Sequence, residues 1–259
     1  MGHQRLGTLP RSKEWSEVIA LIAHGENVGV IAAATARAAE RSMIDASGDP
    51  TVRHAFWLLS QIPLAARQPD FPDSLRRLGI NVGREPTLIE ITTGMMQAVD
   101  RMAAKARHRS DLGEMTQLCA IESLNAVAGR ELPDLFGATH TIVRATLAGL
   151  ATVNQFTVLA RDFLSRLTRK HLGYSLSREL PVHVGPNRRF ASIREHDDFE
   201  HALDLHCREA SRILKEFAGQ WYSKRLHEGG IDQAQAGGFV HHAFQKMRDE
   251  LRHRRNADG

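Results

Sequence analysis

Apolar side chains recur every three or four residues along most of this chain, and this spacing constrains its fold more than any other feature. Such a stripe fits one face of an α-helix, whereas a half-buried strand needs apolar and polar residues in alternation. The most regular stripe comprises Phe199, Leu203, His206, Ala210, Ile213 and Phe217. Alternating segments are nearly absent, so the pattern favours helices over sheet.

Residues that cap helices stand in front of several stripes. Asp49 followed by Pro50 is a typical helix start, and Thr87 and Ser192 each precede a glutamate by three residues, which predicts capping boxes. We expect the helix opened by Asp49 to end where it meets Pro63. The sequence therefore predicts an all-α fold, an irregular bundle of roughly eight to ten helices with little or no β-structure.

The composition is that of an ordinary globular protein, because 42% of the 259 residues are hydrophobic and 25% are charged. A disordered or fibrous chain would depart from these values. The helical pattern is interrupted around residues 132–139, which suggests an N-terminal half, 1–135, and a C-terminal half, 136–259. One continuous α domain remains an alternative.

The positive charge of the chain is carried mainly by arginine. The formal net charge is +4, and among 34 Lys and Arg residues lysine occurs only at positions 13, 105, 170, 215, 224 and 246. Arginine binds carboxylates and phosphates through two parallel hydrogen bonds, so this bias suits an interface. A GC-rich genome would produce the same bias without any functional cause.

Two adjacent arginines, Arg188 and Arg189, lie in a Gly-Pro-Asn segment just before the predicted cap Ser192. The free N–H groups at a helix N-terminus attract anions, so this loop is a candidate site for a phosphate or for a carboxylate of a partner. The alternative is internal, because four acids follow closely and could neutralise both guanidinium groups: Glu195, Asp197, Asp198 and Glu200.

A histidine-rich helix follows this loop, but its spacing does not favour a metal site. His201 and His206 are five residues apart, and ligands on one helix face need spacings of three or four. His206 lies in the apolar stripe, which predicts a buried, hydrogen-bonded histidine, with Glu122 as one possible partner. The sequence also lacks a Gly-x-Ser-x-Gly motif and a glycine-rich phosphate loop. We therefore expect no metal and no cofactor.

The C-terminal segment carries the one pattern that resembles an enzyme motif. Residues 248–253 read Arg-Asp-Glu-Leu-Arg-His. This resembles the motif of HEPN ribonucleases, in which four to six residues separate an arginine, often followed by a polar residue, from a histidine. The resemblance covers six residues and implies a small helical bundle in which Arg248 would orient phosphate and His253 would act as acid or base. A basic patch of Arg248, Arg252, Arg254 and Arg255 could alternatively bind nucleic acid without cleaving it.

The most economical interpretation is a non-enzymatic helical adaptor, a subunit of a larger bacterial assembly that binds protein partners through an arginine-rich interface. The alternatives are a HEPN-like ribonuclease in a toxin or antiviral role and a non-catalytic nucleic-acid-binding subunit. The first residues lack the pattern of a signal peptide, and the longest apolar run, residues 28–36, is too short to cross a membrane. With only two cysteines, we expect free thiols, a cytoplasmic protein and no contact with membranes.

Overall fold

The computed structural model describes residues 11–39, 42–43, 45, 48–106, 110–132, 138–177 and 179–257. Its α-helices are α1 (Lys13–Ala23), α2 (Val28–Ala38), α4 (Pro50–Ala66), α5 (Phe71–Arg77), α6 (Leu88–Lys105), α7 (Asp111–Gly129), α8 (His140–Gly149), α9 (Val153–Leu176), α10 (Ile193–Ala210), α11 (Leu214–His227) and α12 (Gln233–Ala257). Two short 3₁₀-helices, η1 (Leu180–His183) and η2 (Ser211–Ile213), stand before and after α10. Within these ranges β-pairing is limited to one isolated bridge between Val184 and Phe190. The prediction of an all-α multi-helix bundle is confirmed.

Side-chain caps open the helices where the sequence predicts them. Asp49 accepts a hydrogen bond from the N–H of the second residue of α4 at 2.7 Å. Thr87 accepts the N–H of Glu90 at 3.2 Å, and Ser192 accepts that of Glu195 at 3.4 Å. Each of these bonds satisfies one of the N–H groups that the first turn of a helix leaves free.

The predicted end of α4 at Pro63 is wrong, because the helix continues to Ala66. Proline has no N–H and removes one bond of the helical ladder. Here it stands in the last turn, where few residues follow it. Ile62, Pro63 and Ala66 are all buried, and the burial of this last turn offsets the lost bond.

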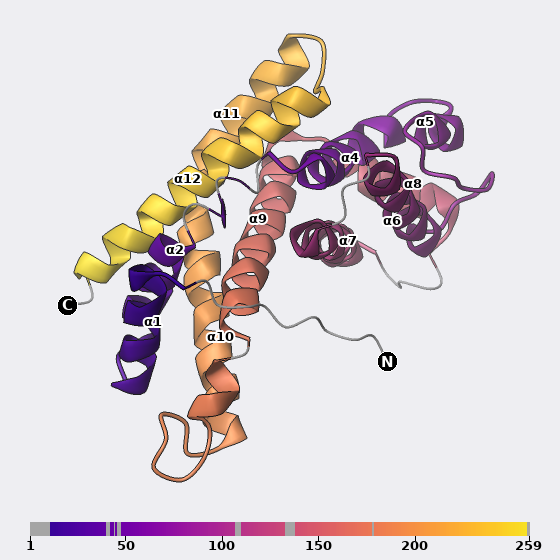
Figure 1. Cartoon of the computed structure of the whole chain (residues 1–259). Coiled ribbons are helices and arrows are strands. Elements are labelled where there is room, and N and C mark those ends of the chain that lie inside the picture. The colour runs from indigo at the N-terminus through magenta and orange to yellow at the C-terminus, as the bar shows by residue number, and fades with distance from the viewer. Residues whose placement is uncertain are drawn as a thin grey trace.

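The long helix α9 forms the centre of the molecule (Figure 1). Helices α7, α10 and α11 pack directly against it, while α12 packs against α2 and α4. In Figure 1, α4 to α8 gather on one side of α9, and α1, α2, α10 and α12 lie on the other. Because α10, η2 and α11 follow one another without a break, they run along α9 as one long rod.

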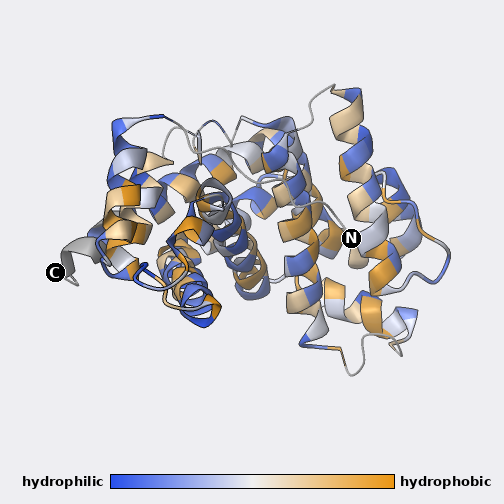
Figure 2. Cartoon of the chain, turned by 60° about the horizontal axis from the view of Figure 1, so that its bottom comes forward, coloured by the Kyte–Doolittle hydropathy of each residue, from blue (hydrophilic) through white to orange (hydrophobic). Residues whose placement is uncertain are grey.

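One continuous core joins helices from both predicted halves. Its aromatic centre includes Phe156 and Tyr222, with ring centroids 3.8 Å apart, and Phe56 and Phe239, with centroids 4.9 Å apart. The boundary proposed at 135/136 lies in segment 133–137, outside the described residues. Figure 2 shows that the helices carry hydrophobic and hydrophilic residues together, as the apolar stripes require.

Arginine side chains tie the helix ends together by donating hydrogen bonds to backbone carbonyls. Arg144 on α8 donates to the carbonyls of Ala66, at 3.1 Å, and Gln68, at 2.7 Å, at the C-terminal end of α4. Arg67, which ends α4, donates in return to the carbonyl of Ala148 near the end of α8, at 3.2 Å. The last carbonyls of a helix lack partners within it, and guanidinium groups satisfy them here. Part of the arginine bias therefore serves the fold.

Candidate functional site

The side chains of Arg188 and Arg189, the predicted anion site, donate hydrogen bonds to backbone carbonyls. Arg188 is exposed and donates to the carbonyl of Val182 at 2.8 Å. Arg189 reaches back to the turn between α1 and α2, where it donates to the carbonyl of Glu26 at 3.4 Å. Its guanidinium carbon also lies 5.2 Å from the ring centroid of Phe190. Both arginines thus brace the loop, and a role in binding an anion stays a prediction.

The acids expected to neutralise these arginines have other contacts. Glu195 accepts the N–H of Ala191 at 2.8 Å and so fastens the start of α10. Glu200 forms an ion pair with Arg169 on α9. Among the residues that the structure describes, no carboxylate lies within ion-pair distance of Arg188 or Arg189.

The motif that resembles HEPN ribonucleases lies in the last turns of α12. Arg248 forms two short contacts with Asp249, at 2.8 Å from Nε and 2.7 Å from Nη2. His253 is exposed. The two motif residues are five apart and therefore lie about 140° apart around the helix axis. The side chains of the remaining patch residues lie outside the described part of the chain: Arg252, Arg254 and Arg255.

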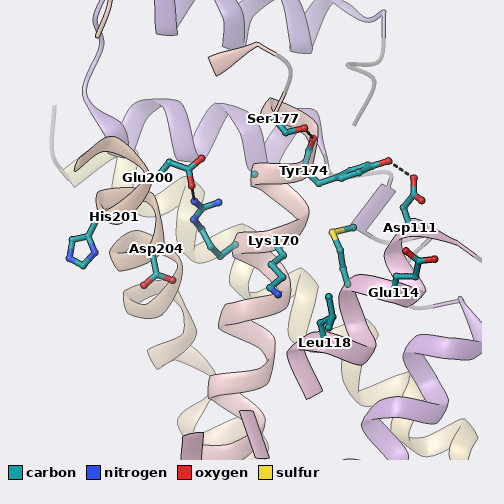
Figure 3. A pocket seen from close by; sticks show the side chains of 12 residues that line it. Asp111, Glu114, Leu118, Lys170, Tyr174, Ser177, Glu200, His201 and Asp204 are labelled. Carbon is teal, nitrogen blue, oxygen red and sulfur yellow. Dashed lines mark hydrogen bonds and ion pairs between the residues drawn. The ribbon is translucent and has the colours of Figure 1, made fainter. Parts of the chain in front are cut away.

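A cleft of about 710 Å³ lies between α7, α9 and α10 (Figure 3). Its volume is in the range of small-molecule sites. We call it the α9 cleft. Its lining residues are Asp111, Glu114, Met115 and Leu118 from α7, Arg169, Lys170, Gly173 and Tyr174 from α9, Ser177 just after α9, and Glu200, His201 and Asp204 from α10. The sequence patterns did not single out this group as a site.

The floor of the α9 cleft is supplied by α9, and its cations are already paired. Arg169 forms the ion pair with Glu200, and Lys170 contacts Glu122 at 2.7 Å. Gly173 makes room for this arrangement, because a Cβ atom at this position would overlap the Arg169 guanidinium. The glycine therefore allows the arginine to lie flat across α9 and to reach α10.

The wall formed by α7 combines carboxylates with apolar side chains. Asp111 accepts a hydrogen bond from the Tyr174 hydroxyl, which links α7 to α9. Glu114 is exposed at the rim. Leu118 is 48% exposed, and Met115 is half-buried beside it. An exposed leucine at the edge of a hollow gives the cleft an apolar contact surface.

Negative charge predominates in the α9 cleft although the whole chain has a net charge of +4. Four carboxylates line it, from Asp111, Glu114, Glu200 and Asp204, against the two cations of the floor. In Figure 3, Glu200 and Asp204 lie on the α10 side and Asp111 and Glu114 on the α7 side. Glu200 and Asp204 form ion pairs with Arg169 and Arg208, so the surplus negative charge lies on the α7 wall, where it attracts a cation and repels an anion.

Nucleophilic side chains elsewhere are held in structural roles. Ser42 lies 2.9 Å from Nε2 of His171, which is the distance of a nucleophile and its base. The Ser42 hydroxyl, however, donates its proton to the carbonyl of Ala39 at 2.8 Å, so the imidazole Nε2–H is the donor to the serine oxygen. Cys119 and Cys207 are buried, and this burial raises the pKa of both thiols to about 12, which keeps them protonated and unreactive.

Known proteins give no direct guide to the cleft. Comparison of the chain with protein-family models, curated sequences and solved structures finds no match. The described residues contain no group of three or more His, Cys, Asp or Glu side chains arranged to hold a metal ion. None of the described helices is by itself long and apolar enough to cross a membrane. Helices α8 and α9, with a bend of 91° between them, reach that length and hydropathy only when they are taken together.

Proposed function

We propose that this chain is a non-enzymatic helical subunit of a larger cytoplasmic assembly and that it holds a partner protein in the α9 cleft. The observation that carries this proposal is the combination of exposed Leu118 with carboxylates on two facing walls. Apolar contact area supplies affinity at interfaces, and surrounding charges supply orientation and specificity. The buried, protonated state of Cys119 and Cys207 suits a reducing compartment such as the cytoplasm.

Photo-crosslinking in living cells tests this proposal. A benzoylphenylalanine residue at position 118 would project into the cleft, and the same residue at position 193 provides a control, because Ile193 is 72% exposed and does not line the cleft. We expect one discrete crosslinked partner from position 118 and a different or empty pattern from position 193. Identical patterns from both positions, or none from position 118, would overturn the proposal.

An RNA assay tests the alternatives that place the site at the end of α12. End-labelled RNA is incubated with the purified chain and resolved on native and denaturing gels at two salt concentrations. We expect neither cleavage nor a shift. Cleavage that disappears in His253→Ala would replace the proposed function by the ribonuclease, and a salt-sensitive shift without cleavage would favour nucleic-acid binding.

A further inference from the structure

The chemistry of the α9 cleft also indicates what kind of segment it receives. Resting on the proposed function, we infer that the occupant is an extended or helical partner segment in which arginine or lysine side chains stand beside apolar ones. The cations would lie against the carboxylate of Glu114 on the α7 wall, and the apolar side chains would cover Met115 and Leu118.

The charge of the walls carries the first step. Glu114 on α7 and Asp204 on α10 belong to opposite walls, with α9 between them (Figure 3). On the α10 wall, Asp204 forms an ion pair with Arg208 at 2.7 Å, and Glu200 is paired with Arg169. Among the described residues Glu114 forms no ion pair, and Lys170 is paired with Glu122. A cation from outside therefore meets an unneutralised carboxylate on the α7 wall, whereas a phosphate or an acidic segment would be repelled there.

The spacing along the walls carries the second step, because it favours a segment over a single compact cation. Asp111, Glu114 and Leu118 follow one another at three and four residues, so they form a line on one face of α7. Seven residues of helix span about 10 Å, which is longer than one side chain can cover. Glu200 and Asp204 repeat this spacing of four on α10. A line of charged and apolar groups on α7, facing a line of polar groups on α10, matches successive side chains of a peptide.

The apolar part of the wall carries the third step. Leu118 is 48% exposed, although its neighbour Cys119 is completely buried. Met115, one turn earlier, is a flexible side chain that adapts its shape to different apolar partners. An occupant that brought only charge would leave these two side chains in contact with water, so the inferred segment includes at least one apolar residue.

Charge variants of the crosslinking experiment test this inference. The partner peptide crosslinked to position 118 is identified by mass spectrometry, and its yield is compared in Glu114→Lys and Asp198→Lys. Both variants make the same change of charge at an exposed acid, but Asp198 does not line the cleft. We expect a peptide with arginine or lysine beside an apolar residue, a yield reduced about tenfold by Glu114→Lys, and a change below about twofold for Asp198→Lys.

A synthetic peptide of the crosslinked segment then gives the affinity, measured by fluorescence anisotropy with the full chain. We expect Glu114→Lys to weaken its binding about tenfold and spermidine, a compact cation, to compete poorly. An acidic or uncharged segment, or a yield that ignores Glu114→Lys, overturns this inference but leaves the proposed function intact. Equal occupancy of the cleft by spermidine also overturns it. Absence of any crosslink at position 118 overturns both.

Discussion

Replacing His171 by glutamine should make the stability of the protein less sensitive to acid. His171 lies on α9 with its side chain buried, and Nδ1 of its ring has no hydrogen-bond partner. Its Nε2 donates to the Ser42 hydroxyl, 2.9 Å away. A second proton on this ring would have to remain in the core without a compensating charge. Burial accordingly lowers the pKa of His171 from 6.5 to about 4.

The sign and size of the effect follow from this shift. At pH 7.5 the imidazole is neutral in the folded and the unfolded chain, so its titration costs nothing. Below pH 6.5 the unfolded chain binds a proton that the folded chain binds only near pH 4, and stability is lost throughout this window. The loss from His171 alone is about 2 kcal/mol at pH 5 and approaches about 3 kcal/mol below pH 4.

Urea unfolding, followed by tryptophan fluorescence at pH 7.5 and pH 5, measures this loss. The glutamine amide can still donate to Ser42, so the His171→Gln variant should lie within about 1 kcal/mol of wild type at pH 7.5. Between the two pH values it should lose about 2 kcal/mol less than wild type does. His227→Gln, at an exposed position of α11, controls for the removal of one histidine. Parallel losses in wild type and His171→Gln would refute the reasoning.

Three further predictions follow from packing and burial. Arg144→Met should lower the free energy of unfolding by about 1–2 kcal/mol, because two carbonyls at the end of α4 lose their donor. Gly94→Ala should destabilise the protein by about 1–3 kcal/mol, because the added Cβ would lie 2.9 Å from a side chain of the preceding loop. Gly129→Ala should be neutral or stabilising, because a Cβ there would meet no atom within 4 Å. Urea unfolding measures the free energy of unfolding of all three variants. A thiol reagent at pH 8 should modify Cys119 and Cys207 only after the protein unfolds. The absorbance of the chromophore that the reagent releases follows the modification, and rapid labelling of the native protein would contradict the burial.

The helical nature of the fold was predictable because it depends on local signals. Caps such as Asp49, Thr87 and Ser192 accept hydrogen bonds from N–H groups two or three residues away. The residues that determine these helix starts are therefore close together in the sequence. The end of α4 was not predictable in this way. The core contacts that hold the turn after Pro63 come from distant parts of the chain, and they outweigh the local preference of proline to end a helix.

The arginine bias shows a similar limit. A guanidinium group near a helix could bind a partner, a phosphate or a carbonyl of another helix, and sequence spacing does not distinguish these. Arg144 and Arg67 donate across 76 to 81 residues of chain, to carbonyls whose position only the packed structure defines. The backbone contacts of Arg188 and Arg189 belong to the same class.

The α9 cleft was missed because it is formed between helices. The sequence stripe placed Phe199, Leu203 and Ala210 inside, and all three are buried. Farther along, Cys207 and Leu214 are buried, whereas His206 is half-buried and Ile213 is 47% exposed. The cleft residues Glu200 and Asp204 directly follow the buried Phe199 and Leu203, so the helix period places them at the edge of the buried face. That this edge faces α7 across α9 depends on how three helices pack together, and no spacing within α10 defines this packing.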